Sequence, residues 1–394
     1  MDRICMYTPS ARGGHALYTA ELLTALTRHP AGGPRFELLT SQDIDPAFVS
    51  GVYPVNAILP PLAHRGQFRT RLGWAVNRSL HYSRRDRCFL KWLAGRPDIA
   101  GVHLQEYFPW RPAPLFRGIR RLRRKIFYTV HNLSQHAYPP LLPRRVWDHL
   151  SRSAWRLADC LFVLTPELGE RLSRLLGPGH PPIRVVPHGV WTVNGSAHIP
   201  ALTERLTWKR LLFFGTIRRN KGLDLLLDAA ESLPGYSFTI AGEPLDPDYF
   251  NEEVLPRIRQ LQSRGVPIQL VDRFTSEQEA GALFASHSAI VLPYTQQFAS
   301  QSGVAFLALA HELPIVASEV GGLRDLFRQF PIGHSFTDLT SAGLAAAVHS
   351  FFDGNHRDQL LGQIRAAKQF FSWETAAAAT LAGYAACLEG GPQR

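Results

Sequence analysis

Cysteine is scarce in this chain, with only four among 394 residues. The four are widely scattered and form no Cys-x-x-Cys pair: Cys5, Cys88, Cys160 and Cys387. This spacing argues against a disulfide-built scaffold and against the common zinc motifs. The first residues, MDRICMY, lack the apolar core of a signal peptide. We therefore expect a protein of the reducing cytoplasm.

Long hydrophobic runs and several ligand motifs are also missing. No stretch approaches about eighteen uninterrupted apolar residues, so no membrane-spanning helix is expected. The Gly-Lys-Ser/Thr ending of a Walker A loop is absent, so ATP hydrolysis is not expected. Asp246-Pro-Asp248 has an Asp-x-Asp spacing, but it lies in a turn-like stretch and is interpreted as a structural turn. We therefore expect no bound metal.

Acidic residues are few between residues 60 and 125, where three face sixteen lysines and arginines. This local excess of positive charge is larger than the net charge of the whole chain, +11. Aromatic residues are interleaved with the cations. The combination suits an anionic membrane surface, which we favour, and it would also suit RNA. A solvated basic face with core aromatics remains the third interpretation, and no nucleic-acid motif is present.

Strand-like apolar runs alternate with helical stretches along the chain, a pattern typical of parallel α/β sheets. The predicted strands are residues 4–8, 36–41, 101–105, 126–131, 160–165 and 183–189, then 211–215, 237–242, 268–274, 289–294 and 314–318. We predict an α/β protein in which two doubly wound, Rossmann-like domains face a central cleft. Their predicted bounds are 1–190 and 208–371, with a linker at 191–207. A helix at 372–394 could pack back on the first domain.

Two strand–loop–helix junctions in the second half have the character of phosphate sites. In LLFFGTIRRNKGLDLLLDAA (211–230), a strand leads through Arg218, Arg219 and Lys221 to a helix. In the second junction, the strand SAIVLPY is followed by a polar loop, and Ser302-Gly303 then begins an apolar helix. Helix starts and cations bind phosphate oxygens, so two such junctions in one sheet favour a diphosphate ligand. A solvated basic turn is the alternative interpretation of the first loop.

Two features in the first half lie where a ligand would bind. Gly13-Gly14 follows the first predicted strand and precedes a helix, where glycine permits close backbone approach. His131 ends the predicted strand IFYTVH, and a neutral imidazole there could hydrogen-bond a sugar hydroxyl. Alternatively, Gly13-Gly14 forms only a tight turn, and His131 is a polar side chain with its hydrogen bonds made inside the protein.

Together these pieces resemble the retaining glycosyltransferases of the GT-B fold, family 4, over nearly the whole chain. The matching segments are GGHALY, TVH, RLADCLFVLT with VVPHGV, FFGTIRRNKGLDLLLDA and ELPIVASEVGGL. The resemblance implies a nucleoside-diphosphate sugar bound mainly by the second domain and an acceptor bound mainly by the first. It implies no required metal and no protein base, since the departing phosphate is thought to take the acceptor's proton.

The resemblance also assigns residues. His131 would contact the donor sugar, while Arg218 and Lys221 would neutralise the leaving diphosphate; we predict these three as catalytic. The other predicted donor-binding residues are Gly13, Gly14, Thr216, Gly242, Glu243, Val271, Phe274, Gln301, Ser302, Gly303 and Val304.

Two departures from the family pattern leave the donor sugar open. Thr216 stands where arginine is common, and Arg218 is expected to substitute. The family's paired glutamates fall on Ala299 and Leu307. Gln301-Ser302-Gly303 partly takes their place, as in a branch of the family with QSG here.

We predict a glycosyltransferase that moves a hexose, with retention, to a lipid-linked or polysaccharide-precursor acceptor. Its expected place is the cytoplasmic membrane face, reached through residues 60–125, with no nucleic acid as partner. A sugar-nucleotide epimerase and a non-catalytic nucleotide-sugar-binding homologue are the alternatives.

Overall fold

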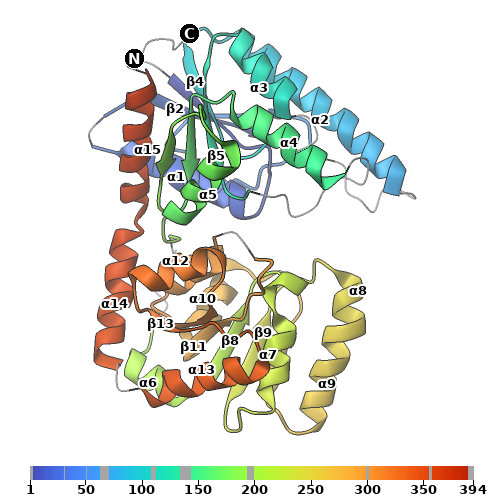
Figure 1. Ribbon diagram of the computed structural model, residues 1–394, viewed down its shortest axis with the longest axis vertical. Coiled ribbons are helices and arrows are strands. Elements are labelled where there is room, and N and C mark those ends of the chain that lie inside the picture. The colour runs from blue at the N-terminus through green and yellow to red at the C-terminus, as the bar shows by residue number, and fades with distance from the viewer. Residues whose placement is uncertain are drawn as a thin grey trace. The chain divides into compact units, whose positions relative to one another are not determined.

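The computed structural model describes residues 3–30, 32–49, 51–62, 71–107, 112–133, 143–192, 199–298, 301–354 and 357–388. The chain divides into two compact units, which are described separately. Unit 1 comprises Met1–Gly189 and Trp373–Arg394, and unit 2 comprises Val190–Ser372. Each unit is built around one parallel β-sheet covered by helices (Figure 1). The two doubly wound domains predicted from the sequence are confirmed.

Unit 1 contains a seven-stranded sheet in the order β3-β2-β1-β4-β5-β6-β7. Its strands are β1 (Arg3–Tyr7), β2 (Arg35–Ser41), β3 (Val55–Leu59), β4 (Ile99–Leu104), β5 (Lys125–Val130), β6 (Cys160–Val163) and β7 (Ile183–Val185). The inner strands are buried on both faces, which explains their continuous apolar runs. The strand order reverses between β1 and β4, the place where open α/β sheets bind ligands.

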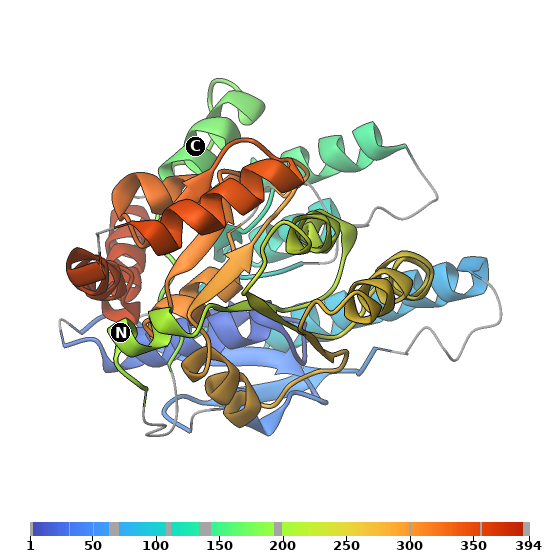
Figure 2. The same cartoon turned by 90° about the horizontal axis from the view of Figure 1, so that it is seen from below.

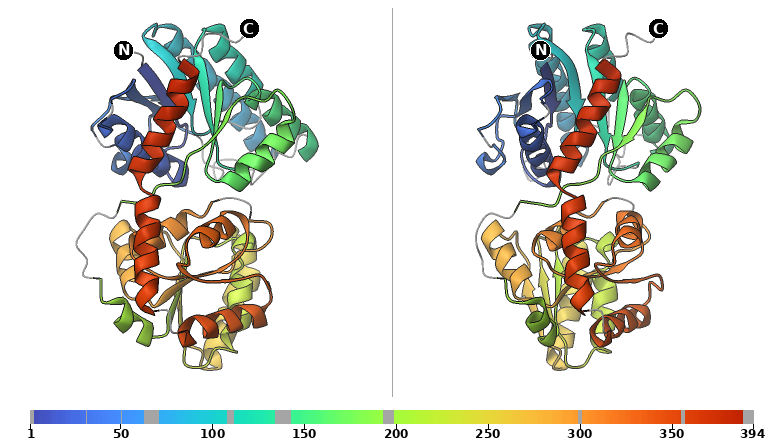
Figure 3. Two further views of the ribbon diagram at one scale, coloured as in Figure 1. Left: turned by 60° about the vertical axis from the view of Figure 1, so that its left-hand side comes forward. Right: turned by 90° about the vertical axis from the view of Figure 1, so that its left-hand side faces the viewer.

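Helices cover both faces of this sheet. They are α1 (Gly14–Arg28), α2 (Arg71–Ala94), α3 (Pro112–Arg121), α4 (Arg144–Trp155), α5 (Pro166–Leu176) and α15 (Trp373–Leu388), with a 3₁₀ turn η1 (Pro46–Phe48). Helices α2, α3 and α4 lie together on one side, whereas α15 lies with α1 on the other (Figures 1 and 3). Tyr384 of α15 is fully inside unit 1, where its hydroxyl is 2.5 Å from Nδ1 of His103. Helix α15 is therefore an integral part of unit 1.

Unit 2 contains a six-stranded sheet in the order β10-β9-β8-β11-β12-β13. Its strands are β8 (Arg210–Phe214), β9 (Ser237–Ala241), β10 (Ile268–Val271), β11 (Ala289–Leu292), β12 (Ile315–Ser318) and β13 (Gly333–Phe336). The strand order reverses between β8 and β11. This second switch point is a second expected ligand position.

The helices of unit 2 follow its strands in turn. They are α6 (Leu202–Thr207), α7 (Leu223–Ala230), α8 (Pro247–Tyr249), α9 (Leu255–Ser263), α10 (Glu277–Ala285), α11 (Gly303–Ala310), α12 (Gly321–Gln329), α13 (Ser341–Asp353) and α14 (Arg357–Phe370), with short turns η3 (Arg219–Lys221) and η4 (Phe250–Val254). Helix α13 lies beside α7 and β13, against one face of the sheet (Figure 2). No helix among the described residues combines the length and apolar character needed to cross a bilayer.

The segment expected as a linker, 191–207, is part of unit 2 and contains α6. Arg205 of α6 is 1% exposed and donates to the backbone oxygens of His287 (3.1 Å) and Phe284 (3.2 Å). A buried guanidinium thus anchors a helix whose polar sequence suggested a free connection. The structure also contains two strands that the sequence analysis missed, β3 and β13, and both lie at sheet edges.

Candidate functional site

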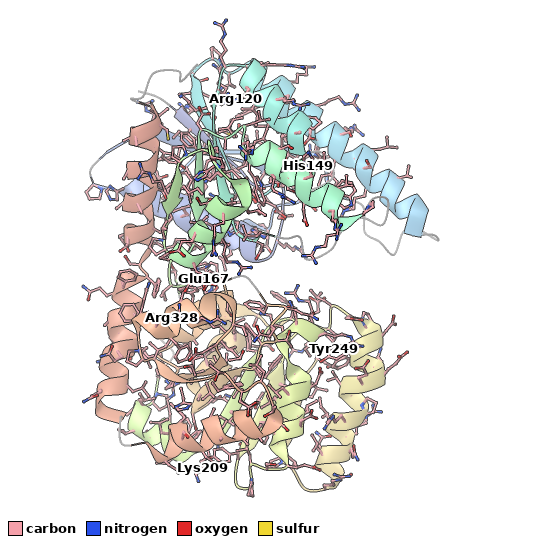
Figure 4. All side chains as sticks on the ribbon, viewed as in Figure 1. Arg120, His149, Glu167, Lys209, Tyr249 and Arg328 are labelled. Atoms are coloured by element: carbon pink, nitrogen blue, oxygen red, sulfur yellow. The ribbon has the colours of Figure 1, made fainter. Side chains whose placement is uncertain are left out.

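The loop that follows β8 presents three cations in two different states. Arg219 is already paired: its Nη1 lies 2.8 Å from Oε2 of Glu253, and its guanidinium lies 4.6 Å from the ring centroid of Tyr249. Tyr249, labelled in Figure 4, is at the end of the short helix α8. Arg219 therefore holds the loop to its surroundings, which leaves Arg218 and Lys221 to meet a ligand.

Lys221 is a buried cation that contacts aromatic rings and forms no ion pair with the residues that the structure describes. Its residue is 7% exposed, and Nζ lies 3.9 Å from the ring centroid of Tyr294 and 4.4 Å from that of Phe298. Burial, followed by the charge of Arg218, lowers the pKa of the Lys221 ammonium to about 7. Aromatic faces stabilise a cation but do not neutralise it. An anionic ligand would supply the missing countercharge.

Arg218 adds a second unneutralised charge beside Lys221. Its Nε atom is buried and has no hydrogen-bond partner among the described residues. Burial lowers the pKa of its guanidinium, as it does for Lys221. Two neighbouring cations without a carboxylate can share a group with several anionic oxygens, such as a diphosphate.

Two glycines bring this loop close to the sheet. At Gly222 (φ +66°) an added Cβ would lie 1.8 Å from the backbone oxygen of Pro293, just after β11. At Gly242 (φ +155°) it would lie 1.8 Å from the oxygen of Gly215, just after β8. Only glycine permits these approaches. The approach at Gly222 holds the neighbouring Lys221 at the β8/β11 switch point.

The start of α11 lies at the same switch point. Ser302 caps α11 by accepting a hydrogen bond from the N–H of Ala305 (3.3 Å), and its Oγ lies 2.9 Å from the hydroxyl of Tyr294. Tyr294 thus contacts both Lys221 and the cap of α11. The first N–H groups of a helix have no partner within it, so those of Gly303 and Val304 are available to oxygen ligands.

Further predicted residues join this group. Val304 lies close to Gly215, where an added Cβ would be 3.0 Å from its Cγ2, and Thr216 follows directly. The side chain of Gln301 lies against Gly322 in the first turn of α12. Sequence reasoning missed Trp191, whose Nε1 donates to the oxygen of Gly303 (2.6 Å). Its only sequence signal was a tryptophan in a polar segment.

The remaining predicted donor residues join this group only through their backbones, are exposed, or lie outside the description; the oxygen of Val271, for example, accepts from the N–H of Gly242 (2.9 Å). Val271 is the last residue of β10, two strands away from β8, and Phe274 is 78% exposed. The side chain of Glu243 is exposed, while its backbone oxygen accepts from the N–H of Ile217 (3.0 Å). Ala299 lies outside the described residues, and Leu307 is a partly buried residue of α11.

The predicted residues of unit 1 lie at the carboxyl ends of its strands. Gly13 (φ +88°) precedes α1, Gly14 begins it, and an added Cβ at either would meet nothing within 4 Å. His131 follows β5, and its ring packs edge-on against those of His15 (4.5 Å) and Tyr18 (5.0 Å). Burial and neighbouring imidazoles hold the pKa of His131 well below its usual range, so the ring is neutral. Its Nε2 has no hydrogen-bond partner among the described residues.

Metal ligation finds no support in the part of the chain that the structure describes, where no group of three His, Cys, Asp or Glu side chains could hold an ion. Asp246, the first residue of the Asp-x-Asp sequence, caps α8 by accepting from the N–H of Tyr249 (3.2 Å). This segment is therefore the start of a helix and not the turn expected from the sequence.

Comparison with known proteins agrees with this architecture. The family model "Glycosyltransferase Family 4" matches residues 12–192, and the model "Glycosyl transferases group 1" matches residues 208–353. A glycogen synthase of Mycobacterium tuberculosis (strain H37Rv) is 30% identical over 248 residues. That alignment covers 60% of this chain and 56% of the relative, so the chain matches only about half of the relative's length.

Solved structures show the same fold at low sequence identity. Sucrose-phosphate synthase from Thermosynechococcus elongatus superposes with a TM-score of 0.73 at 18% identity, covering 99% of this chain and all of the other. Anabaena Alr3699/HepE in complex with UDP and glucose gives 0.70 at 16% identity, covering 98% of this chain and all of the other. One family model matches most of each unit, and both units contain a Rossmann-like parallel sheet; the chain belongs to the GT-B glycosyltransferases related to glycosyltransferase family 4.

Proposed function

We propose that the protein transfers a hexose from a nucleoside-diphosphate sugar to an acceptor, with retention of configuration and without a bound metal. The observation that carries this proposal is the pair formed by buried Lys221 and partly buried Arg218 beside the N-terminus of α11, for which the described residues provide no ion-pair partner. Such a site matches a diphosphate, whose charge grows as the sugar leaves. Stabilising that growing charge lowers the barrier.

The roles of the remaining residues follow from the same step. As the bond between the sugar and the diphosphate breaks, Lys221 and Arg218 hold the anionic oxygens, and N–H groups of Gly303 and Val304 bind them as well. The departing phosphate oxygen takes the proton of the acceptor hydroxyl on the same face of the sugar. His131, held neutral by burial, hydrogen-bonds a sugar hydroxyl.

The proposed acceptor is lipid-linked or a polysaccharide precursor met at a membrane. Support comes from α2, where Val76 (49% exposed) and Leu80 (64%) lie on one stripe with three exposed cations, Arg84, Arg87 and Lys91. Their spacing of three to four residues places them on one helix face. Apolar side chains followed by cations suit the headgroup region of an anionic bilayer.

The donor site is tested by Lys221→Met against Arg219→Gln as a matched control from the same loop. Thermal shift with UDP, GDP and ADP first identifies the nucleotide, and hydrolysis and transfer are then followed with the corresponding sugar nucleotides. Lys221→Met should lose transfer while the fold is kept, and Arg219→Gln should keep most of it. Full activity of Lys221→Met would refute the assignment.

The same assay separates the two alternatives. Conversion of the sugar nucleotide without any acceptor would favour an epimerase. Leu307, at a position where the resemblance predicts a carboxylate, is the observation that favours a non-catalytic homologue. That reading predicts nucleotide binding with no turnover over a broad panel of donors and acceptors.

Membrane association is tested by sedimentation with vesicles. The wild type should bind anionic vesicles more than neutral vesicles. The anionic vesicles contain 30 mol% phosphatidylserine, a proportion on the order of that in an anionic membrane surface. The double variant Val76→Ser/Leu80→Ser should bind less, whereas Leu175→Ser, which changes an exposed leucine on α5 (37% exposed), should bind normally. Equal binding of all three proteins would remove the support that α2 gives.

A further inference from the structure

Unit 1 contains a buried arginine that its own structure leaves incompletely paired. Arg85 of α2 is 1% exposed, and its Nη2 donates to the backbone oxygen of Pro9 (2.9 Å). Its Nε and Nη1 atoms are also buried, and they have no hydrogen-bond partner among the described residues. Burying charged donors without partners costs several kcal/mol, so such a group is expected to meet a ligand or ion.

The position of Arg85 is the second reason to expect a ligand. Pro9 and Ser10 follow β1, and Glu106 follows β4; the order of the sheet reverses between these two strands. Ser10 Oγ donates to Glu106 Oε2 (2.5 Å), which joins the two strand ends. Lys221, also a buried cation, lies at the corresponding switch point of unit 2. Each sheet therefore has a buried cation where the topology predicts a ligand.

The surroundings of Arg85 are polar and charged. Burial is the main cause that raises the pKa of the Tyr7 phenol. The charges of Asp86 and Glu106 raise this pKa further, whereas the charge of Arg85 lowers it. Tyr82 joins this neighbourhood: its ring centroid lies 5.9 Å from the Arg85 guanidinium, and its hydroxyl accepts from Arg78 (3.3 Å). A ligand here would meet a cation, a carboxylate and hydroxyl groups together.

We propose that Arg85 forms an anion subsite of unit 1, which binds a phosphate or carboxylate group of the acceptor. Ser10 and Glu106 bind a hydroxyl beside that anion. This inference rests on one part of the proposed function, namely that unit 1 binds the acceptor. It restricts the acceptor to compounds that carry an anionic group next to a hydroxyl.

The binding test uses inorganic phosphate and acetate as probes in the double variant Arg218→Gln/Lys221→Met, so that neither cation of the donor site contributes. Sodium chloride at equal ionic strength is the blank. We expect phosphate, acetate or both to raise the Tm of this protein, and the effect to vanish when Arg85→Met is added. A response to phosphate alone indicates a phosphorylated acceptor, and a response to acetate alone indicates a carboxylate. The proposal would be overturned if the Tm rise were the same with Arg85 and with Arg85→Met. It would also be overturned if neither anion raised the Tm at 50 mM, a concentration on the order of the Kd of a weak site.

Two further measurements keep this test independent of folding and of the proposed function. Arg85→Lys keeps the charge but loses the planar fork, and it should weaken the response at least severalfold while the unfolding transition stays cooperative. In protein with Arg218 and Lys221 intact, Arg85→Met should bind the donor nucleotide as tightly as the wild type does. If the wild type itself binds no nucleotide, that result counts against the proposed function but does not affect the anion test.

Discussion

Lys221 Nζ lies 3.9 Å from the ring centroid of Tyr294, and the hydroxyl of the same tyrosine lies 2.9 Å from the Oγ of Ser302. Tyr294 follows β11, so one side chain links the buried cation of the loop after β8 to the cap of α11. The cation and the helix N-terminus are therefore positioned together. A ligand that moves one of them will disturb the other.

Replacing Tyr294 separates these two contacts. Tyr294→Leu removes the ring beneath Lys221 and should weaken binding of the donor nucleotide about fivefold, since a partly desolvated cation–π contact contributes about 1 kcal/mol. Tyr294→Phe keeps the ring and should bind within about twofold of the wild type. Isothermal titration calorimetry measures both. Equal losses in the two variants would assign the effect to the Ser302 contact instead.

Nucleotide-sugar binding should take up protons at alkaline pH. In the free protein the pKa of Lys221 is lowered to about 7, so at pH 8 its side chain is largely the neutral amine. A bound diphosphate favours the charged form and raises that pKa, so binding at pH 8 should take up about one proton. At pH 6 the uptake should be close to zero. Titrations in buffers of different ionisation enthalpy measure the number, and Lys221→Arg, which stays charged at both pH values, should take up none.

Lys221→Met should stabilise the protein without ligand, and more strongly at pH 6 than at pH 9. Lys221 has a folded-state pKa of about 7 against 10.5 when unperturbed. Below pH 7 both states are protonated, and the folded state bears the full desolvation penalty of the charge. Between pH 7 and 10.5 the unfolded state binds more protons, so this penalty shrinks as pH rises. Thermal unfolding at both pH values measures the difference, with Lys91→Met, at an exposed site on α2, as the control for replacing a lysine by methionine.

Gly222→Ala should destabilise unit 2 far more than Gly235→Ala does. Both glycines have positive φ, +66° and +83°, so alanine at either is strained by about 1 kcal/mol. At Gly235 a Cβ would meet nothing within 4 Å, whereas at Gly222 it would lie 1.8 Å from the oxygen of Pro293. Chemical denaturation should show at least about 2 kcal/mol of additional loss for Gly222→Ala. Similar losses in the two variants would mean that the loop moves away from β11 at little cost.

The sequence predicted the inner strands of both sheets because buried parallel strands are continuous apolar runs. It missed β3 and β13, which are edge strands with partly exposed residues. The loop of Arg218 and Lys221 was found because strand, glycine, cations and helix are consecutive in the chain. Trp191 and Arg205 were missed because their partners, Gly303 and His287, are distant in sequence. Arg85 was one of sixteen cations in a basic region, and only packing distinguishes it from its exposed neighbours.

The hydrogen bond from the N–H of Val190 to the oxygen of Phe371 (2.6 Å) has a consequence for biosynthesis. It brings the two ends of unit 2 side by side, so this unit is a self-contained insertion within unit 1. On the ribosome, unit 2 can close as soon as residue 372 has emerged. Unit 1 must wait for α15, whose Tyr384 fills the space beside His103 and Phe127. Unit 1 can therefore complete its packing only after all of unit 2 has been made.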